Sequence, residues 1–205
     1  GVAFANAFLG INHSLSHKLG GWFHIPHGTA NALLAPYVCK FNAQRHPYHM
    51  GTFSQYKYPQ AFERYVELGE LIGVKGKNDE ETFKNWIKAL EQLKADIDIP
   101  PTICDWLCEA HPEKSAEDWE KEFLAAVDQM SEWAFHDACT GANPVYPMIG
   151  ELKQVYLRAF YGDDKFIEKY GDVLCLEINN PTDTHAAYPL GLTAEIGEDK
   201  VGGFK

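Results

Sequence analysis

The apolar residues of this chain follow helical spacing over most of its length. Residues 2–19 are predicted to form one buried helix, because apolar side chains recur at positions 2, 4, 8, 9, 11, 15 and 19. Residues 27–41 are rich in Ala and Leu and predict a second helix, in which Pro36 is expected to bend the axis or shift the register. Residues 60–72 predict an amphipathic helix that is ended by the glycines that follow it.

Capping residues and prolines divide the rest of the chain into further helices. Asn78 precedes three acidic residues and predicts the start of a helix with a negatively charged first turn. Residues 98–102 contain two prolines and interrupt the chain. Ser115 is expected to cap a helix that runs through Met130. Residues 148–161 are expected to form the last clear helix.

Two stretches lack a helical pattern. Residues 45–59 are rich in Pro, His, Tyr and Gln and predict a loop that exposes aromatic side chains. Residues 173–178 predict a short strand, followed by a turn. The expected fold is therefore an all-α domain over residues 1–162, followed over residues 163–205 by an irregular or partly β tail or a small extra module.

Composition and charge narrow the class of protein. The hydrophobic fraction of 45% and the charged fraction of 23% are ordinary for a globular domain. The net charge of −11 argues against a nucleic-acid partner or an anionic membrane surface. No apolar run approaches the roughly 20 residues that span a bilayer. The first residues carry no basic segment of a signal peptide and read as the middle of a helix, so a truncated or incomplete gene product is expected.

The cysteines predict reduced thiols. Their number is odd and their positions are scattered, which favours a reducing compartment and a cytoplasmic location. Cys104 and Cys108 are four positions apart and, with His111, suggest a metal cluster. Their apolar neighbours favour a second interpretation, in which both cysteines are small buried side chains of an amphipathic helix. The paired spacing of a structural zinc site is not present there.

A histidine-rich segment carries the most informative chemistry. Four of the nine histidines lie within residues 13–27. His13 and His17 are four apart, so on a helix their imidazoles project from one face. Pro26 is a helix-start signal. We therefore expect the first turn of the following helix to return His27 toward the other two rings.

Three imidazoles in this arrangement suit a transition metal. Neutral imidazole binds zinc, copper, iron and nickel, and a carboxylate in the set shifts the preference toward non-haem iron or catalytic zinc. A histidine taken singly more often fills a polar gap. The i,i+4 pair instead favours metal binding or catalysis. Residues 1–60 contain no Asp or Glu, so a carboxylate ligand has to come from another segment.

The same segment resembles a known family. The motifs that carry the resemblance are Ala5-Asn6-Ala7-Phe8-Leu9-Gly10, His13-x-x-x-His17, Pro26-His27-Gly28 and Ala30-Asn31-Ala32. They resemble the iron-dependent alcohol dehydrogenases, and most of all the alcohol dehydrogenase half of bifunctional aldehyde-alcohol dehydrogenases. The end of that half is similar to a second block, Cys139-Thr140-Gly141-Ala142-Asn143-Pro144-Val145-Tyr146-Pro147, with Glu151-Leu152-Lys153-Gln154 and Tyr161-Gly162.

The resemblance implies a fold and a set of site residues. It implies the helical metal-binding domain of a dehydroquinate synthase-like fold, without the upstream nicotinamide-binding domain that would bind most of the NAD. It implies one divalent metal, iron first and zinc as the alternative, for which His13 and His27 match two ligands. The other two family ligands, an Asp and a His, lie upstream. His17 matches the histidine near the nicotinamide and the substrate that is associated with proton movement.

The implied activity is the interconversion of small primary alcohols and aldehydes by hydride transfer with NAD, with the metal polarising the substrate oxygen. The chain alone is expected to be inactive, and a homo-oligomer or filament is expected in the full-length context. Two alternatives remain. One is an isolated helical assembly or interaction module with an incomplete metal site. The other is a metal-dependent hydrolase, which needs a carboxylate base near His13 and His17.

Overall fold

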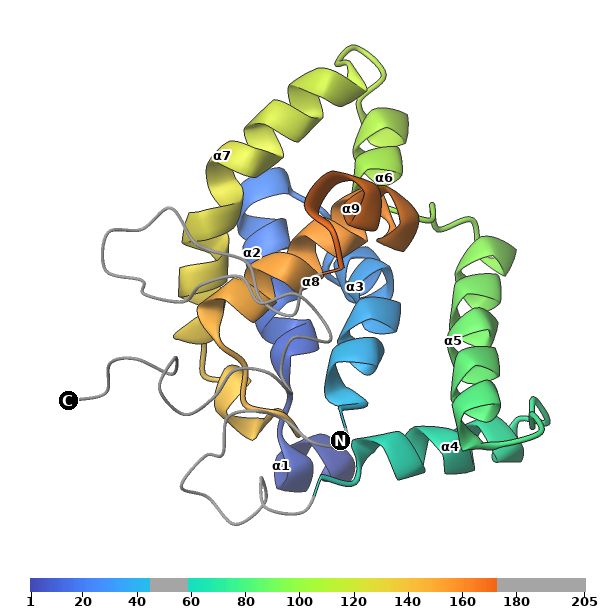
Figure 1. Cartoon of the computed structure of the whole chain (residues 1–205). Coiled ribbons are helices and arrows are strands. Elements are labelled where there is room, and N and C mark those ends of the chain that lie inside the picture. Colours follow the sequence, from blue (N-terminus) through green and yellow to red (C-terminus); the bar gives the residue numbers. More distant parts are fainter. Residues whose placement is uncertain (45–58, 173–205) are drawn as a thin grey trace, which may run out of the picture.

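A computed structural model describes residues 1–44 and 59–172 of the chain and places them in helices joined by short connections (Figure 1). Within those ranges there is no strand, so the all-α prediction is confirmed for the described part of the chain. Most of the loop predicted at 45–59 and the strand predicted at 173–178 lie outside the described residues.

The single helix predicted over residues 2–19 is wrong, because the chain breaks after its second turn. Helix α1 spans Val2–Ala7 and α2 spans Ile11–Phe23. Phe8 adopts φ 59° between them. A β-carbon on Gly10 would lie 2.6 Å from Oδ1 of Asn143, and that same oxygen accepts the first backbone N–H of α2. The break therefore depends on a residue more than 130 positions away.

Helices α2 and α3 form the centre of the fold. Helix α3 spans His27–Asn42, lies beside α2 and remains helical through Pro36 (Figure 1). The two helices are separated by only three residues, of which His24 has the left-handed conformation that ends α2. This tight reversal brings residues 12–17 of α2 next to the first turns of α3.

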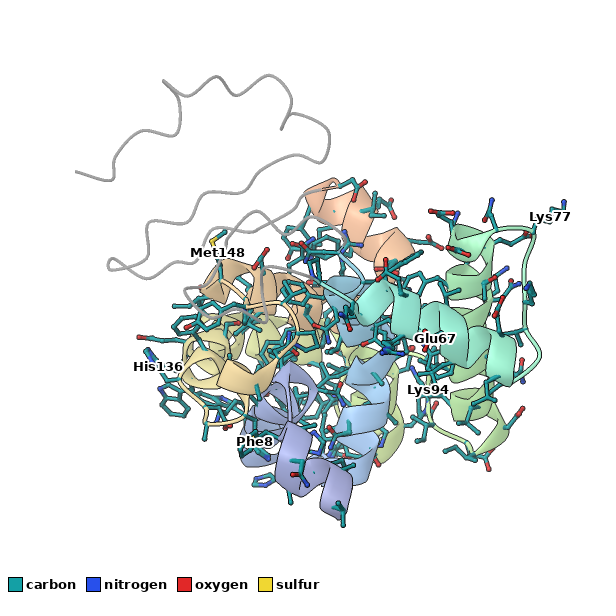
Figure 2. The ribbon with its side chains drawn as sticks, turned by 90° about the horizontal axis from the view of Figure 1, so that it is seen from below. Phe8, Glu67, Lys77, Lys94, His136 and Met148 are labelled. Atoms are coloured by element: carbon teal, nitrogen blue, oxygen red, sulfur yellow. The ribbon has the colours of Figure 1, made fainter. Side chains whose placement is uncertain are left out.

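Helices α4, spanning Ala61–Leu71, and α5, spanning Asp79–Asp96, pack against each other at one edge of the molecule. Figure 2 shows Lys77 at the outer end of this pair, in the connection between the two helices. The predicted cap is confirmed, because the side chain of Asn78 accepts the N–H of Glu81 at 2.8 Å. Only α5 of the pair lies along much of α3.

The remaining helices close the core. Helix α6 spans Ile103–Ala110, α7 spans Ala116–Phe135, and α8 spans Ile149–Tyr161. A short 3-10 turn, η2, spans Thr140–Ala142. Ser115 caps α7 as predicted, although α7 continues beyond Met130.

Helices α2, α3, α7 and α8 contribute most of the buried apolar side chains. The ring of Phe123 stacks on Phe160 at a centroid distance of 4.3 Å and on Phe23 at 5.4 Å. The fully buried hydroxyl of Tyr156 donates to the carbonyl of Leu15 at 2.8 Å, which joins α8 to α2. The histidine-bearing helix is therefore held from two sides.

One further helix follows where only a tail was expected. Helix α9 spans Asp163–Tyr170 and packs on α8 (Figure 1). Phe166 is fully buried, and Lys40 and Arg158 both donate to the carboxylate of Asp163. Residues 163–170, the start of the predicted tail, thus belong to the helical core. A separate tail or module remains a prediction for the residues beyond 172.

The cysteines of α6 agree with the apolar interpretation. Cys104 and Cys108 are half-buried and pack against the core as small side chains. In the described ranges they are not part of a three-residue set of potential metal ligands with His111. No helix among the described residues is long and apolar enough to cross a membrane.

Candidate metal centre

The three histidines meet at one surface of the molecule. His13 and His17 lie on α2 and His27 opens α3, as the spacing predicts. The ring centroids of His13 and His27 are 5.2 Å apart, those of His17 and His27 are 5.5 Å apart, and those of His13 and His17 are 6.3 Å apart. The structure therefore brings these imidazoles within reach of one another.

The environment of His13 favours the neutral ring. Partial burial and the neighbouring His27 and His17 lower the pKa of His13 below its ordinary value. Phe4 of α1 approaches the same ring edge-on, at a centroid distance of 6.3 Å. A neutral imidazole has one nitrogen with a free lone pair, which is the form that binds a metal.

Side chains around His27 fix the orientation of its ring. Nδ2 of Asn31 lies 3.0 Å from Nε2 of His27, and Oδ1 of Asn31 accepts an N–H from Asn12 at 2.9 Å. Because Asn31 donates to Nε2, that nitrogen carries the lone pair and Nδ1 carries the proton. Nδ1 faces the hydroxyl of Ser16 at 3.4 Å. A metal at Nε2 would replace the Asn31 donor.

A carboxylate from a residue 120 positions later in the sequence lies beside His17. Oδ2 of Asp137 lies 3.1 Å from Nδ1 of His17 and 2.7 Å from Nζ of Lys18, and Oδ1 accepts the N–H of Cys139 at 3.0 Å. Burial alone would raise the pKa of Asp137, but these hydrogen bonds outweigh it and hold that pKa well below its ordinary value. The ionised carboxylate can only accept, so Nδ1 of His17 carries its proton and Nε2 has the lone pair.

Residues 139–147, the second block of the family resemblance, link several helices through hydrogen bonds. Oγ1 of Thr140 lies 2.8 Å from Oγ of Ser14 on α2 and 2.5 Å from the carbonyl of Ala134 on α7. Nδ2 of Asn143 donates to Asn42 at the end of α3 at 2.6 Å, while its Oδ1 caps the start of α2. These buried contacts fix the turn that carries Asp137.

A sequence comparison decides the family. Residues 1–160 match the profile of the Fe-containing alcohol dehydrogenase family, C-terminal. The chain belongs to the iron-containing alcohol dehydrogenase family. This confirms the resemblance that the histidine motifs and the second block carry.

Relatives of this chain include proteins described as bifunctional enzymes. The chain is 48% identical over 166 residues to the bifunctional aldehyde-alcohol dehydrogenase AdhE of Escherichia coli (strain K12), covering 80% of this chain and 18% of that protein. It is 36% identical over 164 residues to the NADPH-dependent butanol dehydrogenase of Clostridium saccharobutylicum, covering 80% of this chain and 36% of that protein. The chain thus spans only about a fifth to a third of the length of these relatives.

Solved structures of the family share the helical fold. An iron-containing alcohol dehydrogenase from Thermococcus thioreducens superimposes with a TM-score of 0.59 at 31% identity, over 79% of this chain and 34% of that one. A 1,3-propanediol oxidoreductase gives a TM-score of 0.59 at 28% identity, over 78% of this chain and 35% of that one. The helical fold of this chain is therefore that of its family.

The residues present in this chain fit part of a metal site. His13 and His27 offer two ring nitrogens from adjacent helices, which is half of a tetrahedral set. The Asp137 contact to Nδ1 orients the ring of His17, whereas the Asn31 contact lies on Nε2 of His27, the nitrogen that a metal would take over. The donor types suit iron or zinc, and a tetrahedral site would need two further ligands.

Sequence reasoning missed Asp137. It lies two residues before the block that carries the family resemblance, and 120 positions after His17. The helical periodicity of the sequence does not distinguish this carboxylate from other acidic side chains. The adjacency to the second block was the only signal available.

Proposed function

We propose that this chain forms the metal- and substrate-binding helical part of an alcohol dehydrogenase that interconverts small primary alcohols and aldehydes by hydride transfer with NAD. The convergence of the His13, His17 and His27 rings, in a member of the iron-containing family, carries this proposal. The nicotinamide would be bound mainly by an additional α/β domain, so the chain alone is expected to be inactive.

The proposed metal ligands are Nε2 of His27 and a ring nitrogen of His13. Iron is the first candidate and zinc the second, because both accept imidazole ligands. When bound, such a metal polarises the oxygen of the alcohol or aldehyde. The hydrogen bond from Asn31 identifies Nε2 of His27 as the ring nitrogen with the lone pair, and a bound metal would take the place of that donor.

His17 is proposed to handle the proton and to lie next to the nicotinamide. Its side chain is 40% exposed, so it is open to a substrate and a cofactor that approach from outside the helical core. Because Nδ1–H donates to Asp137, Nε2 is the atom that can take or give a proton. Asp137 holds the ring in place for this exchange.

The hydrolase alternative finds weaker support. It needs a carboxylate that acts as a base near His13 and His17, and Asp137 is the nearby candidate. The contacts of Asp137 with Lys18 and with the N–H of Cys139 lower its pKa and leave it a poor base.

One observation favours the alternative in which the chain is a helical assembly module. Val2, Phe4 and Phe8 of the first segment are mostly exposed apolar side chains, and Figure 2 shows Phe8 at the outer edge of the molecule. Such a patch suits a contact with another domain or another copy of the chain. We propose that a homo-oligomer or filament forms in the full-length protein, in the cytoplasm, where free thiols persist.

Turnover and metal content test the proposal together. This chain, joined to a nicotinamide-binding domain and loaded with iron or zinc, is expected to oxidise ethanol with NAD, and NADP is compared in parallel. His27→Ala is expected to lose both metal and activity. His17→Asn is expected to keep the metal and lower kcat by about 10²–10⁴-fold. His111→Ala, at the residue that follows α6, is the control.

If the joined protein remains inactive and His27→Ala does not change its metal content, the dehydrogenase function is wrong. Retention of oligomers under those conditions supports the assembly alternative.

A further inference from the structure

A second group of potential metal ligands lies beside the histidine cluster. A ring nitrogen of His17, a carboxylate oxygen of Asp137 and the sulfur of Cys139 all lie within 4.8 Å of one another. The group combines one nitrogen, one oxygen and one sulfur, and it shares neither His13 nor His27. It therefore differs in both position and chemistry from the two-imidazole pair.

The local backbone holds two of these ligands in fixed relation. The N–H of Asp137 donates to the carbonyl of Ala134, and the N–H of Thr140 donates to the carbonyl of Asp137 at 3.0 Å. The N–H of Cys139 also binds the Asp137 side chain at 3.0 Å. Since Thr140 is itself anchored to Ser14 of α2, this turn presents its carboxylate and thiol toward His17 without further folding.

We propose that His17, Asp137 and Cys139 form a binding site for zinc. Zinc binds imidazole, carboxylate and thiolate ligands together in tetrahedral sites. Its bond lengths imply that two neighbouring ligand atoms lie roughly 3.3–3.8 Å from each other. Atoms that already lie within 4.8 Å need only small side-chain rotations to reach that spacing. Zinc takes the place of the thiol proton of Cys139 and of the proton that Nδ1 of His17 donates to Asp137, so binding releases both to the solvent. The thiolate selects zinc over magnesium and calcium, and water completes the fourth position.

Lys18 competes with the metal for this site. Its Nζ lies 2.7 Å from Oδ2 of Asp137, so a cation already satisfies the carboxylate. Zinc must displace this ammonium group and overcome its positive charge. Lys18→Gln keeps a hydrogen-bond donor but removes the charge, and it is expected to tighten zinc binding at least about tenfold.

Zinc at this site has a consequence for the proposed dehydrogenase. It would take His17 away from proton transfer, so zinc bound there acts as an inhibitor. This consequence rests on the proposed function, whereas zinc binding itself does not.

Cobalt(II), a spectroscopic substitute for zinc, tests the binding on the full 205-residue chain without any turnover assay. The wild-type chain is expected to show a thiolate-to-cobalt charge-transfer band that zinc abolishes by competition. Cys139→Ser is expected to lose the band and to weaken zinc binding at least about tenfold. Cys104→Ser and His27→Ala are matched controls and are expected to keep the band.

Three outcomes overturn the site. They are the absence of a band in the wild-type chain, its survival in Cys139→Ser, and its loss in Cys104→Ser. None of these outcomes bears on whether iron at His13 and His27 supports alcohol oxidation, so the two proposals fail separately.

Discussion

Nδ1 of His17 lies 3.1 Å from Oδ2 of Asp137, which joins the middle of α2 to the turn that follows α7. The same oxygen binds Lys18 at 2.7 Å, so the carboxylate is shared between a ring that is proposed to move protons and an ammonium group that neutralises it. This contact fixes both the tautomer and the orientation of His17. It also links α2 to the segment that follows α7.

Asp137→Asn is expected to lower the free energy of unfolding by roughly 2 kcal/mol at neutral pH, because charged hydrogen bonds are lost. The pKa of Asp137 is lower in the folded state than its ordinary 3.8, so its contribution is present above that value and is lost as the pH falls below it. Urea unfolding between pH 3 and 7 measures the difference. It should shrink below about pH 4, while Asp96→Asn, which affects a single exposed contact with Gln92, should change little. A constant difference across this range would contradict the assignment.

Asn143→Ala is expected to destabilise the protein by about 2–3 kcal/mol. The substitution leaves the first N–H of α2 and the side chain of Asn42 without their buried partner. Thermal or urea unfolding measures the loss. Asn6→Ala removes a comparable amide from exposed α1 and should stay within about 0.5 kcal/mol of the wild type. Equal effects of the two substitutions would refute this role.

Glu151→Gln is expected to change how stability depends on pH. Burial, partly offset by the N–H of Met148, raises the pKa of Glu151 from 4.5 to about 7. The folded state therefore favours the neutral acid, whose contribution is full below pH 4.5 and is lost as the pH rises to about 7. Relative to the variant, the wild type should lose on the order of 3 kcal/mol over that interval. Parallel pH profiles of the free energy of unfolding would show that the carboxyl does not titrate this way.

Phe166→Ala is expected to destabilise the protein by about 3 kcal/mol or more, because a fully buried ring on α9 leaves a cavity. Ile167→Ala truncates the next, largely exposed side chain and should cost less than about 1 kcal/mol. Urea unfolding of the two variants tests whether α9 belongs to the helical core. Similar small losses would place α9 outside it.

The helices that carry their own end signals could be predicted from the sequence. Asn78 and Ser115 cap α5 and α7 as expected, since a side-chain cap acts on a backbone N–H only three residues later. The break before α2 could not be predicted, because it is stabilised by the side chain of Asn143, which lies 132 positions after Ile11. Helix α9 was also missed, because its eight residues hold few apolar positions and its burial depends on the core formed by other helices.

One part of the candidate site could likewise be predicted from the sequence, and another part could not. The sequence by itself determined that His13, His17 and His27 come together, since helical periodicity and a short reversal are local properties of the chain. Only the tertiary structure decided which nitrogen of His17 carries the proton and which carboxylate lies beside it. The physical reason is that Asp137 reaches His17 through the packing of α7 against α2, and the fold sets that packing over 120 positions of sequence.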